Sequence, residues 1–424
     1  MKPSSNVVVT GMGVVSPIGV GCDEFWQNLI DGVSGVRVRE EFADTDMPLR
    51  IYAPIVDFDP KPYVKPRKAL KIMCKPIQFG CAAAAIAFND AGFKKEILEQ
   101  QVSLDRMGTL FGTETFYADP NEVAQVFNSC TVEDNYEHDR WGEFAMRQIQ
   151  PLWMLKYLPN MAASHISIAL DARGPSNSIC HGEASGLLAL IEAADLIRRG
   201  ICDVVVAGGT GSQMSVTAMV YRGTKMLAKR VQEPAAASRP FDLDRDGMVC
   251  GEGSGVVILE SEEHALKRGA KPLARLASWN RGFKAPETVG IAEAFEVSIK
   301  EAIQAADIDP TSIGLVSSNA SGLVEPDAGE AQGIHAALGD VPVVAHKSNF
   351  GNLGPGTSLV ELIGSLLAMN KGVIPPTLNY ETPDPACPVN ASSETRPFEG
   401  QAVLKTSRSA TGQVVSVIFE KADV

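Results

Sequence analysis

Residues 174–186 read Gly174-Pro175-Ser176-Asn177-Ser178-Ile179-Cys180-His181-Gly182-Glu183-Ala184-Ser185-Gly186. We expect a strand first and then a sharp turn, because the small residues allow close approach of the backbone. Apolar residues then recur at helical spacing, which predicts a helix over 184–199 closed by Gly200. Glu183 therefore lies near a helix N-terminus, where unpaired N–H groups and partial positive charge stabilise an anion.

Five further motifs accompany this segment. They are Val7-Val8-Val9-Thr10-Gly11-Met12-Gly13-Val14-Val15-Ser16-Pro17-Ile18-Gly19, Leu158-Pro159-Asn160-Met161-Ala162-Ala163, Ala207-Gly208-Gly209, Arg239-Pro240-Phe241-Asp242 with Gly247, and Gly251-Glu252-Gly253. Together the motifs resemble the β-ketoacyl-acyl-carrier-protein synthases of the thiolase superfamily. The resemblance implies an α/β, thiolase-type fold of five αβαβα layers, built from two halves related by a pseudo-twofold axis.

The chain has 424 residues, of which 45% are hydrophobic and 21% charged, so it can bury a large core. We expect a first half at 1–260, which carries the elbow, and a second half at 261–424. Proline-bearing stretches at 36–66, 117–152 and 374–398 are predicted to be irregular caps and crossing loops.

The resemblance assigns catalytic positions to particular residues of this chain. The family has a nucleophilic cysteine at the elbow, and Glu183 stands in its place. Its two histidines correspond to Ser321 in Asn319-Ala320-Ser321-Gly322 and to Asn352 in Lys347-Ser348-Asn349-Phe350-Gly351-Asn352. Of the four positions, only the lysine, Lys347, is retained.

A gating loop is altered as well. The family's Phe-Gly-Phe-Gly-Gly run, which supplies an oxyanion N–H, corresponds here to Arg408-Ser409-Ala410-Thr411-Gly412, so Arg408, Ala410 and Gly412 occupy the gate. Glu183 has three interpretations: an inert replacement, an ion pair with Arg408, or an acid or base. The structural interpretation is preferred, with the Arg408 pair as its sharpest form.

These substitutions predict that the chain performs no condensation. A carboxylate that attacked a thioester would form an anhydride, which stores an acyl chain poorly. Loss of a single oxyanion donor typically costs about 2.7–4 kcal/mol. The resemblance is strongest to the chain length factor, or ketosynthase β subunit, which usually has glutamine at the elbow and pairs with an active ketosynthase in type II polyketide or specialised fatty-acid synthesis.

Two other functions stay open. One is a homodimeric acyltransferase or malonyl-carrier-protein decarboxylase that uses Glu183 and Lys347. The other is a structural scaffold for acyl carrier proteins, which the family engages.

The resemblance also predicts surfaces. Phe111, Phe116 and Tyr117 are candidates to line a shared acyl tunnel at the dimer interface, and a plain interface core is the alternative. A net charge of −13 argues against nucleic acid as a partner. Lys65, Arg67 and Lys68 belong to a basic cluster that is a candidate carrier-protein site, with an ordinary solvated face as the alternative.

Eight scattered cysteines lack metal-ligand spacing and predict buried free thiols, a reducing cytoplasmic location and no metal site. Cys180 and His181 are expected to serve core packing. The family resemblance calls for no cofactor, and no segment is long and apolar enough to span a membrane.

Overall fold

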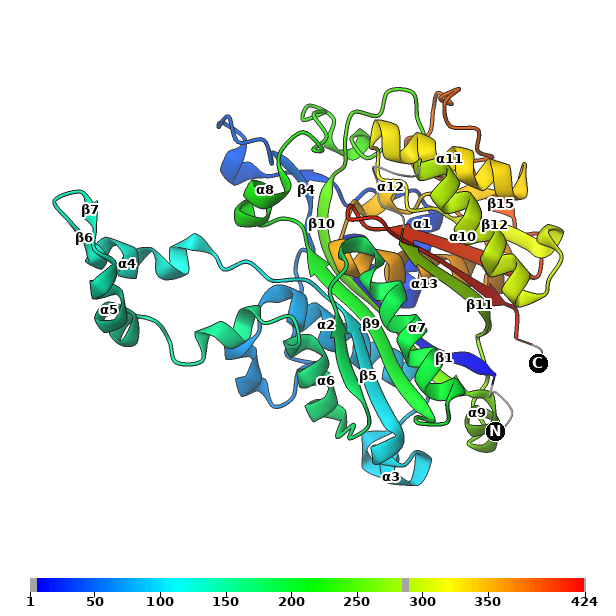
Figure 1. Ribbon diagram of the computed structural model, residues 1–424, viewed down its shortest axis with the longest axis horizontal. Helices are drawn as coiled ribbons and strands as arrows, with labels where there is room; N and C mark the ends of the chain where they lie inside the picture. Colours follow the sequence, from blue (N-terminus) through cyan, green and yellow to red (C-terminus); the bar gives the residue numbers. More distant parts are fainter. Residues whose placement is uncertain (1–5, 284–289, 423–424) are drawn as a thin grey trace.

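The computed structural model describes residues 6–283 and 290–422, and its centre is one long mixed β-sheet (Figure 1). The strands along its main path are, in spatial order, β8 (Ser176–Ile179), β5 (Met107–Gly112), β9 (Val204–Ser212), β10 (Cys250–Ser261), β1 (Val7–Ser16), β11 (Ala274–Phe283), β17 (Gln413–Glu420), β16 (Ala402–Arg408), β12 (Ile313–Ser317) and β13 (Val343–Val344).

The two ends of this sheet repeat one pattern. Each half contributes five strands to the main path. Numbered in chain order within their half, these strands lie side by side in the order third, second, fourth, fifth, first. The pairings β5–β8 and β5–β9 are parallel, whereas β9–β10 and β10–β1 are antiparallel. The second half has the same directions in the same places. This repeat agrees with two similar halves, while their division near residue 260 stays a prediction.

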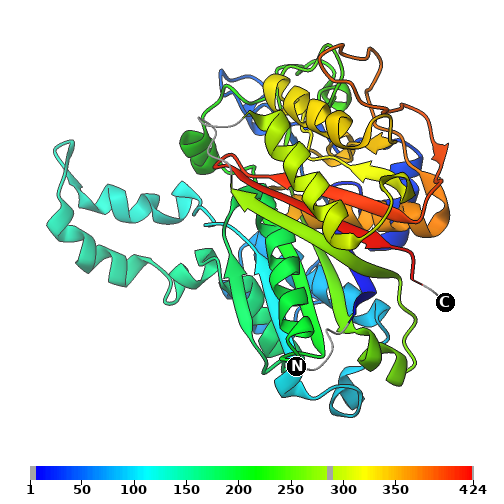
Figure 2. The ribbon, with the colours of Figure 1, turned by 45° about the vertical axis from the view of Figure 1, so that its right-hand side comes forward.

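Helices form three layers around the sheet halves (Figures 1 and 2). On one outer face, α2 (Lys75–Asp90) packs on β1, β9 and β10 beside α6 (Met161–Leu170). In the middle lie α7 (Ser185–Arg198) and α13 (Thr357–Lys371), and α13 contacts strands of both halves. The other outer face carries α10 (Ile291–Ala306) and α11 (Val324–Leu338). The predicted αβαβα order is confirmed.

The middle layer explains why α13 is apolar almost all round. Its residues 357–369 are all buried, because sheet or helix covers every side of this helix. The elbow helix, predicted over 184–199, is α7 at Ser185–Arg198, and Gly200 follows it at φ +68°. The remaining helices and strands of the body are short: β2 (Gly19–Val20), α1 (Cys22–Ile30), β3 (Arg37–Val38), β4 (Ile51–Ala53), α3 (Leu98–Gln101), α8 (Val216–Arg222), α9 (Glu262–Lys267), α12 (Lys347–Phe350), β14 (Val373–Ile374) and β15 (Arg396–Pro397).

The prediction that residues 117–152 form an irregular loop is wrong. Residues 117–152 contain α4 (Pro120–Cys130), the hairpin β6 (Thr131–Val132) and β7 (Asn135–Tyr136), and α5 (Trp141–Gln148). These elements form an arm that projects from the body (Figure 2). Asp119 caps α4 by accepting from the Asn121 N–H, and Phe127 packs edge-on against Trp141 with ring centroids 5.1 Å apart. Local capping and aromatic packing thus build helices in a segment whose prolines indicated loops.

Within the described parts of the chain, no helix has an apolar stretch of the length needed to cross a membrane.

Candidate functional site

A cavity of ≈ 200 Å³ gathers six of the predicted site residues from four separate parts of the chain. The six residues on its wall are Glu183, Ser321, Lys347, Asn352, Arg408 and Ala410. Gly412 is not on the wall and instead closes the β16–β17 hairpin, where its N–H donates to Ser409 O at 3.1 Å. The cavity thus brings together the elbow, both histidine positions, the lysine and two of the three gate residues, while their assigned roles stay a prediction.

The elbow turn is fixed by its own hydrogen bonds. Gly182 has φ +56°, and the Ser185 hydroxyl donates to Gly182 O at 2.6 Å while accepting from the His181 N–H at 2.7 Å. Gly186 is the second residue of α7 and lies against α13, and a Cβ there would lie 2.4 Å from the Leu359 side chain. Only glycine fits this approach, which places Glu183 in the single turn before the helix.

Glu183 hydrogen-bonds to another substituted position rather than to the gate. Asn352 Nδ2 donates to Glu183 Oε1 at 3.0 Å. No ion pair within 4.0 Å joins Glu183 to Arg408, although both residues are described, so the predicted salt bridge is wrong. Burial lowers the pKa of Arg408, and the nearby Glu183 charge opposes that shift without direct contact.

The Asn352 side chain is fully engaged. Its Nδ2 also points to Met248 Sδ at 3.5 Å, while its Oδ1 accepts from Gly354 N at 2.8 Å and from Thr357 Oγ1 at 3.3 Å. Asn352 is 3% exposed. The amide therefore uses both N–H groups and its carbonyl within the protein.

Lys347 is held in a buried charge cluster. Its Nζ donates to Asn319 O at 2.7 Å and lies 3.1 Å from Glu361 Oε1. The second oxygen, Glu361 Oε2, lies 2.7 Å from Lys405 Nζ. Burial lowers the pKa of Lys405 to about 8, and the Glu361 charge resists this. Sequence reasoning found Lys347 but missed Glu361 and Lys405, which are far away in the chain.

Two acids of α11 stand behind Ser321 and were also missed. Asp327 accepts from the N–H groups of Ser321 and Gly322, both at 2.9 Å. Glu330 Oε1 accepts from Asn319 N and Thr406 Oγ1, both at 2.7 Å. Burial raises the pKa of Asp327 and raises that of Glu330 to about 7. Asp327 and Glu330 are three residues apart, which puts both carboxyls on one face of a helix. This spacing is the feature of the sequence from which they could have been predicted.

The predicted tunnel residues lie outside this cavity. Phe111 on β5 is fully buried and Phe116 nearly so, while the Tyr117 ring stacks on Tyr221 at 5.3 Å. Between them, Glu114 accepts from Gln213 Nε2 at 2.8 Å, and burial raises its pKa to about 7. These contacts place all three aromatics beside the end of β5 and leave their tunnel role a prediction.

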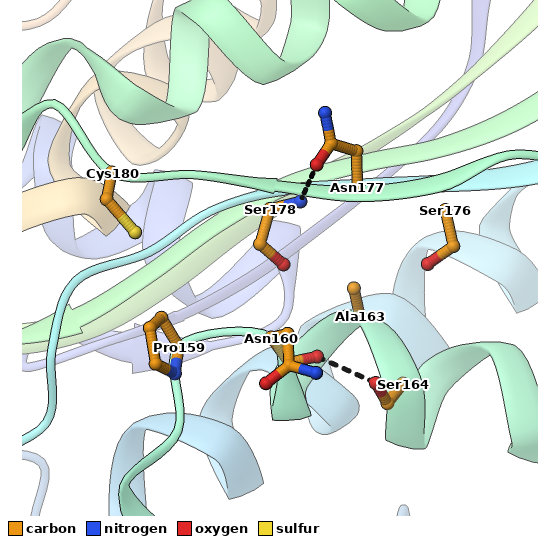
Figure 3. A pocket seen from close by; sticks show the side chains of 8 residues that line it. All are labelled: Pro159, Asn160, Ala163, Ser164, Ser176, Asn177, Ser178 and Cys180. Atoms are coloured by element: carbon orange, nitrogen blue, oxygen red, sulfur yellow. Dashed lines mark hydrogen bonds between the residues drawn. The ribbon is translucent and has the colours of Figure 1, made fainter.

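The edge strand β8 borders a polar hollow next to α6 (Figure 3). Asn177 Oδ1 accepts from the Ser178 N–H at 2.8 Å, and Cys180 lies at one end of the hollow. Cys180 and His181 are exposed, so their predicted role in core packing is wrong. The reason is that β8 is the last strand at this end of the sheet among residues 6–283 and 290–422. All eight cysteines are free, and five of them are buried as predicted.

The predicted carrier-protein residues Lys65, Arg67 and Lys68 are all exposed. They precede and begin the 3-10 helix η2 (Arg67–Ile72), and they are not on the wall of the Glu183 cavity. Their exposure fits either docking or a solvated face.

Family models match most of the chain. The N-terminal domain of beta-ketoacyl synthase matches residues 4–265, and the C-terminal domain of beta-ketoacyl synthase matches residues 277–381. A 3-oxoacyl-acyl-carrier-protein synthase 2 of Vibrio harveyi is 31% identical over 98% of each chain. A putative polyketide beta-ketoacyl synthase 1 of Streptomyces halstedii is likewise 31% identical over 98% of each chain.

Solved structures of the same family share the fold. A type II PKS ketosynthase in complex with its acyl-carrier protein has a TM-score of 0.85 at 27% identity. The ishigamide ketosynthase/chain length factor has a TM-score of 0.85 at 25% identity. Each comparison covers 99% of this chain and 100% of the other.

Proposed function

Because this chain belongs to the beta-ketoacyl synthase family, we propose that it is a non-condensing member that pairs with an active ketosynthase and shapes the acyl or polyketide tunnel. The observation that carries this proposal is the hydrogen bond from Asn352 to Glu183. It joins the position of the nucleophile to the position of a catalytic histidine and engages one oxygen of the Glu183 carboxylate.

The chemistry of the cavity supports this proposal. A carboxylate at residue 183 offers no thiolate, and the acyl anhydride it could form would be hydrolysed readily. An enolate needs preorganised donors, yet the Asn352 amide has both N–H groups engaged and Lys347 is bonded to Asn319 and Glu361. The amide at the second histidine position and the lysine are therefore both held by neighbouring groups of the protein.

The neighbours support a partner-based role. One solved relative is a ketosynthase in complex with its acyl-carrier protein, and another is a ketosynthase/chain length factor. No described strand pairs with the outer edge of β8, and a second subunit can extend the sheet there. An acyl carrier protein and an active ketosynthase are thus the partners that we infer.

The rival function is a decarboxylase that uses Glu183 and Lys347. It would require Lys347 to leave Asn319 O and Glu361, which would leave the fully buried Glu361 carboxylate with Lys405 as its one remaining ion-pair partner among the described residues. The rival scaffold function differs because it predicts no effect on the products of a partner.

The deciding experiment compares the chain alone with the chain co-expressed with a ketosynthase encoded beside it. We expect a stable heterodimer that condenses malonyl-carrier protein, and no decarboxylation or condensation by the chain alone. A homodimer that decarboxylates malonyl-carrier protein, and loses this activity in Glu183→Gln, would establish the rival enzyme.

The tunnel role has its own test. Phe116→Ala in the heterodimer is expected to lengthen the partner's products, since a buried aromatic ring beside β5 is removed. Phe283→Ala, which truncates an exposed ring in the other half, is the matched control. Identical product lengths for Phe116→Ala and the wild type would leave Phe116 as a plain interface residue.

A further inference from the structure

The outer layer of the first half contains a second cavity, which shares only Lys65 with the candidate carrier-protein site. It has a volume of ≈ 490 Å³ and lies between α2, α6 and the segment that leads into η2. None of its wall residues is shared with the Glu183 cavity or with the predicted tunnel set. Its volume falls within the range of about 300–1,000 Å³ that is typical of small-molecule sites.

The wall of this outer cavity is apolar over most of its surface. Hydrocarbon or aromatic surface comes from α2, from α6 and from the residue that follows η2, through Met73, Ala84, Phe88, Ile166 and Leu170. A hydrocarbon chain placed here would be stabilised because each of its methylene groups would leave water for an apolar surface.

One polar group on the wall lacks a partner. His165 on α6 is 9% exposed, and its Nε2 is buried without any hydrogen-bond partner among the described residues. Burial lowers the pKa of His165, so the imidazole is neutral at pH 7. A buried nitrogen without a partner is costly, and a neutral hydroxyl or carbonyl of a ligand would satisfy it once the imidazole ring turns Nε2 toward the cavity.

The rim of the cavity is positively charged. Lys65, Lys94 and Lys95 lie on it with one acid, Glu96. Lys95 Nζ donates to Ala169 O at 2.7 Å, which ties the rim to the end of α6. Lys65 and Lys94 form no ion pair with any described residue and are exposed. Their ammonium groups are available to an anion at the mouth.

We propose that this outer cavity binds a free amphipathic carboxylic acid whose hydrocarbon chain carries a hydroxyl or keto group. The chain lies along the apolar wall, the hydroxyl or keto oxygen bonds to His165 Nε2, and the carboxylate stays at Lys65 and Lys94. The reverse orientation is excluded, because a carboxylate beside a neutral imidazole in an apolar wall would be a buried, uncompensated charge. This proposal stands independently of the proposed pairing with a ketosynthase.

Calorimetric titration of the full chain with decanoate and 3-hydroxydecanoate tests the polar contact. We expect saturable binding of both acids, with the hydroxy acid about fivefold tighter. His165→Phe keeps an aromatic ring but removes Nε2, so it should bind decanoate normally and lose the preference. No binding of either acid, or an unchanged preference in His165→Phe, would overturn the proposal.

Two further variants test the wall and the rim. Ala85→Trp fills the cavity from a half-buried wall position and should abolish binding of both acids, with a melting curve confirming that the variant is folded. Lys65→Met with Lys94→Met should weaken decanoate about tenfold and leave decanol unchanged. Equal weakening of decanoate and decanol, or binding of a decanoyl-pantetheine thioester in preference to the free acid, would contradict the assigned carboxylate site.

Discussion

Glu183 and Asn352 are best understood as a matched pair. Together they form an amide-to-carboxylate hydrogen bond of 3.0 Å. Without Asn352, the Glu183 carboxylate would lose this donor, and without Glu183, the Asn352 amide would lose this acceptor. A hydrogen bond to a charged group contributes about 1.5–3 kcal/mol. The two changes therefore stabilise a site that lacks the nucleophile.

Asn352→Asp is expected to lower the free energy of unfolding by about 2–3 kcal/mol at pH 8, because it replaces the donor with a second carboxylate beside Glu183. Urea denaturation measures this loss. The control is the exchanged pair, Glu183→Gln with Asn352→Asp, which restores one amide and one carboxylate while residue 352 still accepts from Gly354 N. A double variant no more stable than Asn352→Asp would show that the two side chains do not act as a pair.

Glu330 gives a prediction about pH. Burial raises its pKa from 4.5 to about 7 in the folded protein. The folded state therefore holds the proton more tightly than the unfolded state does, and the wild type loses stability as the pH rises from about 4.5 to about 7. Glu330→Gln keeps an oxygen for Asn319 N and Thr406 Oγ1, so it should be more stable than the wild type by about 2–3 kcal/mol at pH 8 and equal to it at pH 4.

Urea denaturation across this pH range measures the effect of Glu330→Gln. Glu263→Gln, which neutralises an exposed glutamate of α9, reports what the substitution itself does. A constant difference between Glu330→Gln and the wild type from pH 4 to pH 8 would mean that Glu330 keeps one protonation state throughout.

At the scale of elements, the edge of β8 determines how the chain can pair. Thr109 N and Thr113 N donate to Pro175 O and Ile179 O, so alternate residues of β8 face β5. The residues between them, Ser176 and Ser178, present their backbone groups outward, although the Ser178 N–H donates to Asn177 Oδ1 in the isolated chain. This outward row is where a partner strand would bind.

Ser176→Pro removes an outward N–H without touching the bonds to β5, so it should leave the fold intact and weaken pairing with the ketosynthase at least about tenfold. Analytical ultracentrifugation of the co-expressed pair measures the change, and Ser176→Ala is the control. Normal heterodimer formation by Ser176→Pro would place the interface on another element.

At the scale of elements, some features can be predicted from the sequence and others cannot. The strand, elbow and helix around Glu183 follow from local spacing, and the convergence of residues 183, 321, 347 and 352 follows from matching motifs. The Glu361–Lys405 contact requires side chains from distant elements to meet, which no local pattern reveals. The Arg408 pair was wrong because an amide nearer to Glu183 bonds it first, and the arm was missed because its helices depend on capping and on the Phe127–Trp141 contact.

At the scale of the whole molecule, the distribution of charge matters more than its sum. A net charge of −13 repels an acidic carrier protein at long range. Lys65, Arg67 and Lys68 are exposed together and form none of the structure's ion pairs, so they offer a local attraction within a Debye length of about 10 Å at 0.1 M salt. A carrier protein that docks here must be attracted by these three residues more strongly than the negative charge of the rest of the molecule repels it.

Replacing Lys65, Arg67 and Lys68 with Glu should therefore weaken carrier-protein binding about tenfold at low salt, and raising the salt should shrink the difference, because screening removes attraction and repulsion alike. Titration of the heterodimer with labelled carrier protein measures both effects. Replacement of Lys225, Lys229 and Arg230 with Glu makes the same change in net charge at another basic cluster, and it separates local docking from the overall field. Equal weakening by the two triple variants would mean that the carrier protein responds only to net charge. Unchanged binding by the variant at Lys65, Arg67 and Lys68 would mean that these residues form an ordinary solvated face.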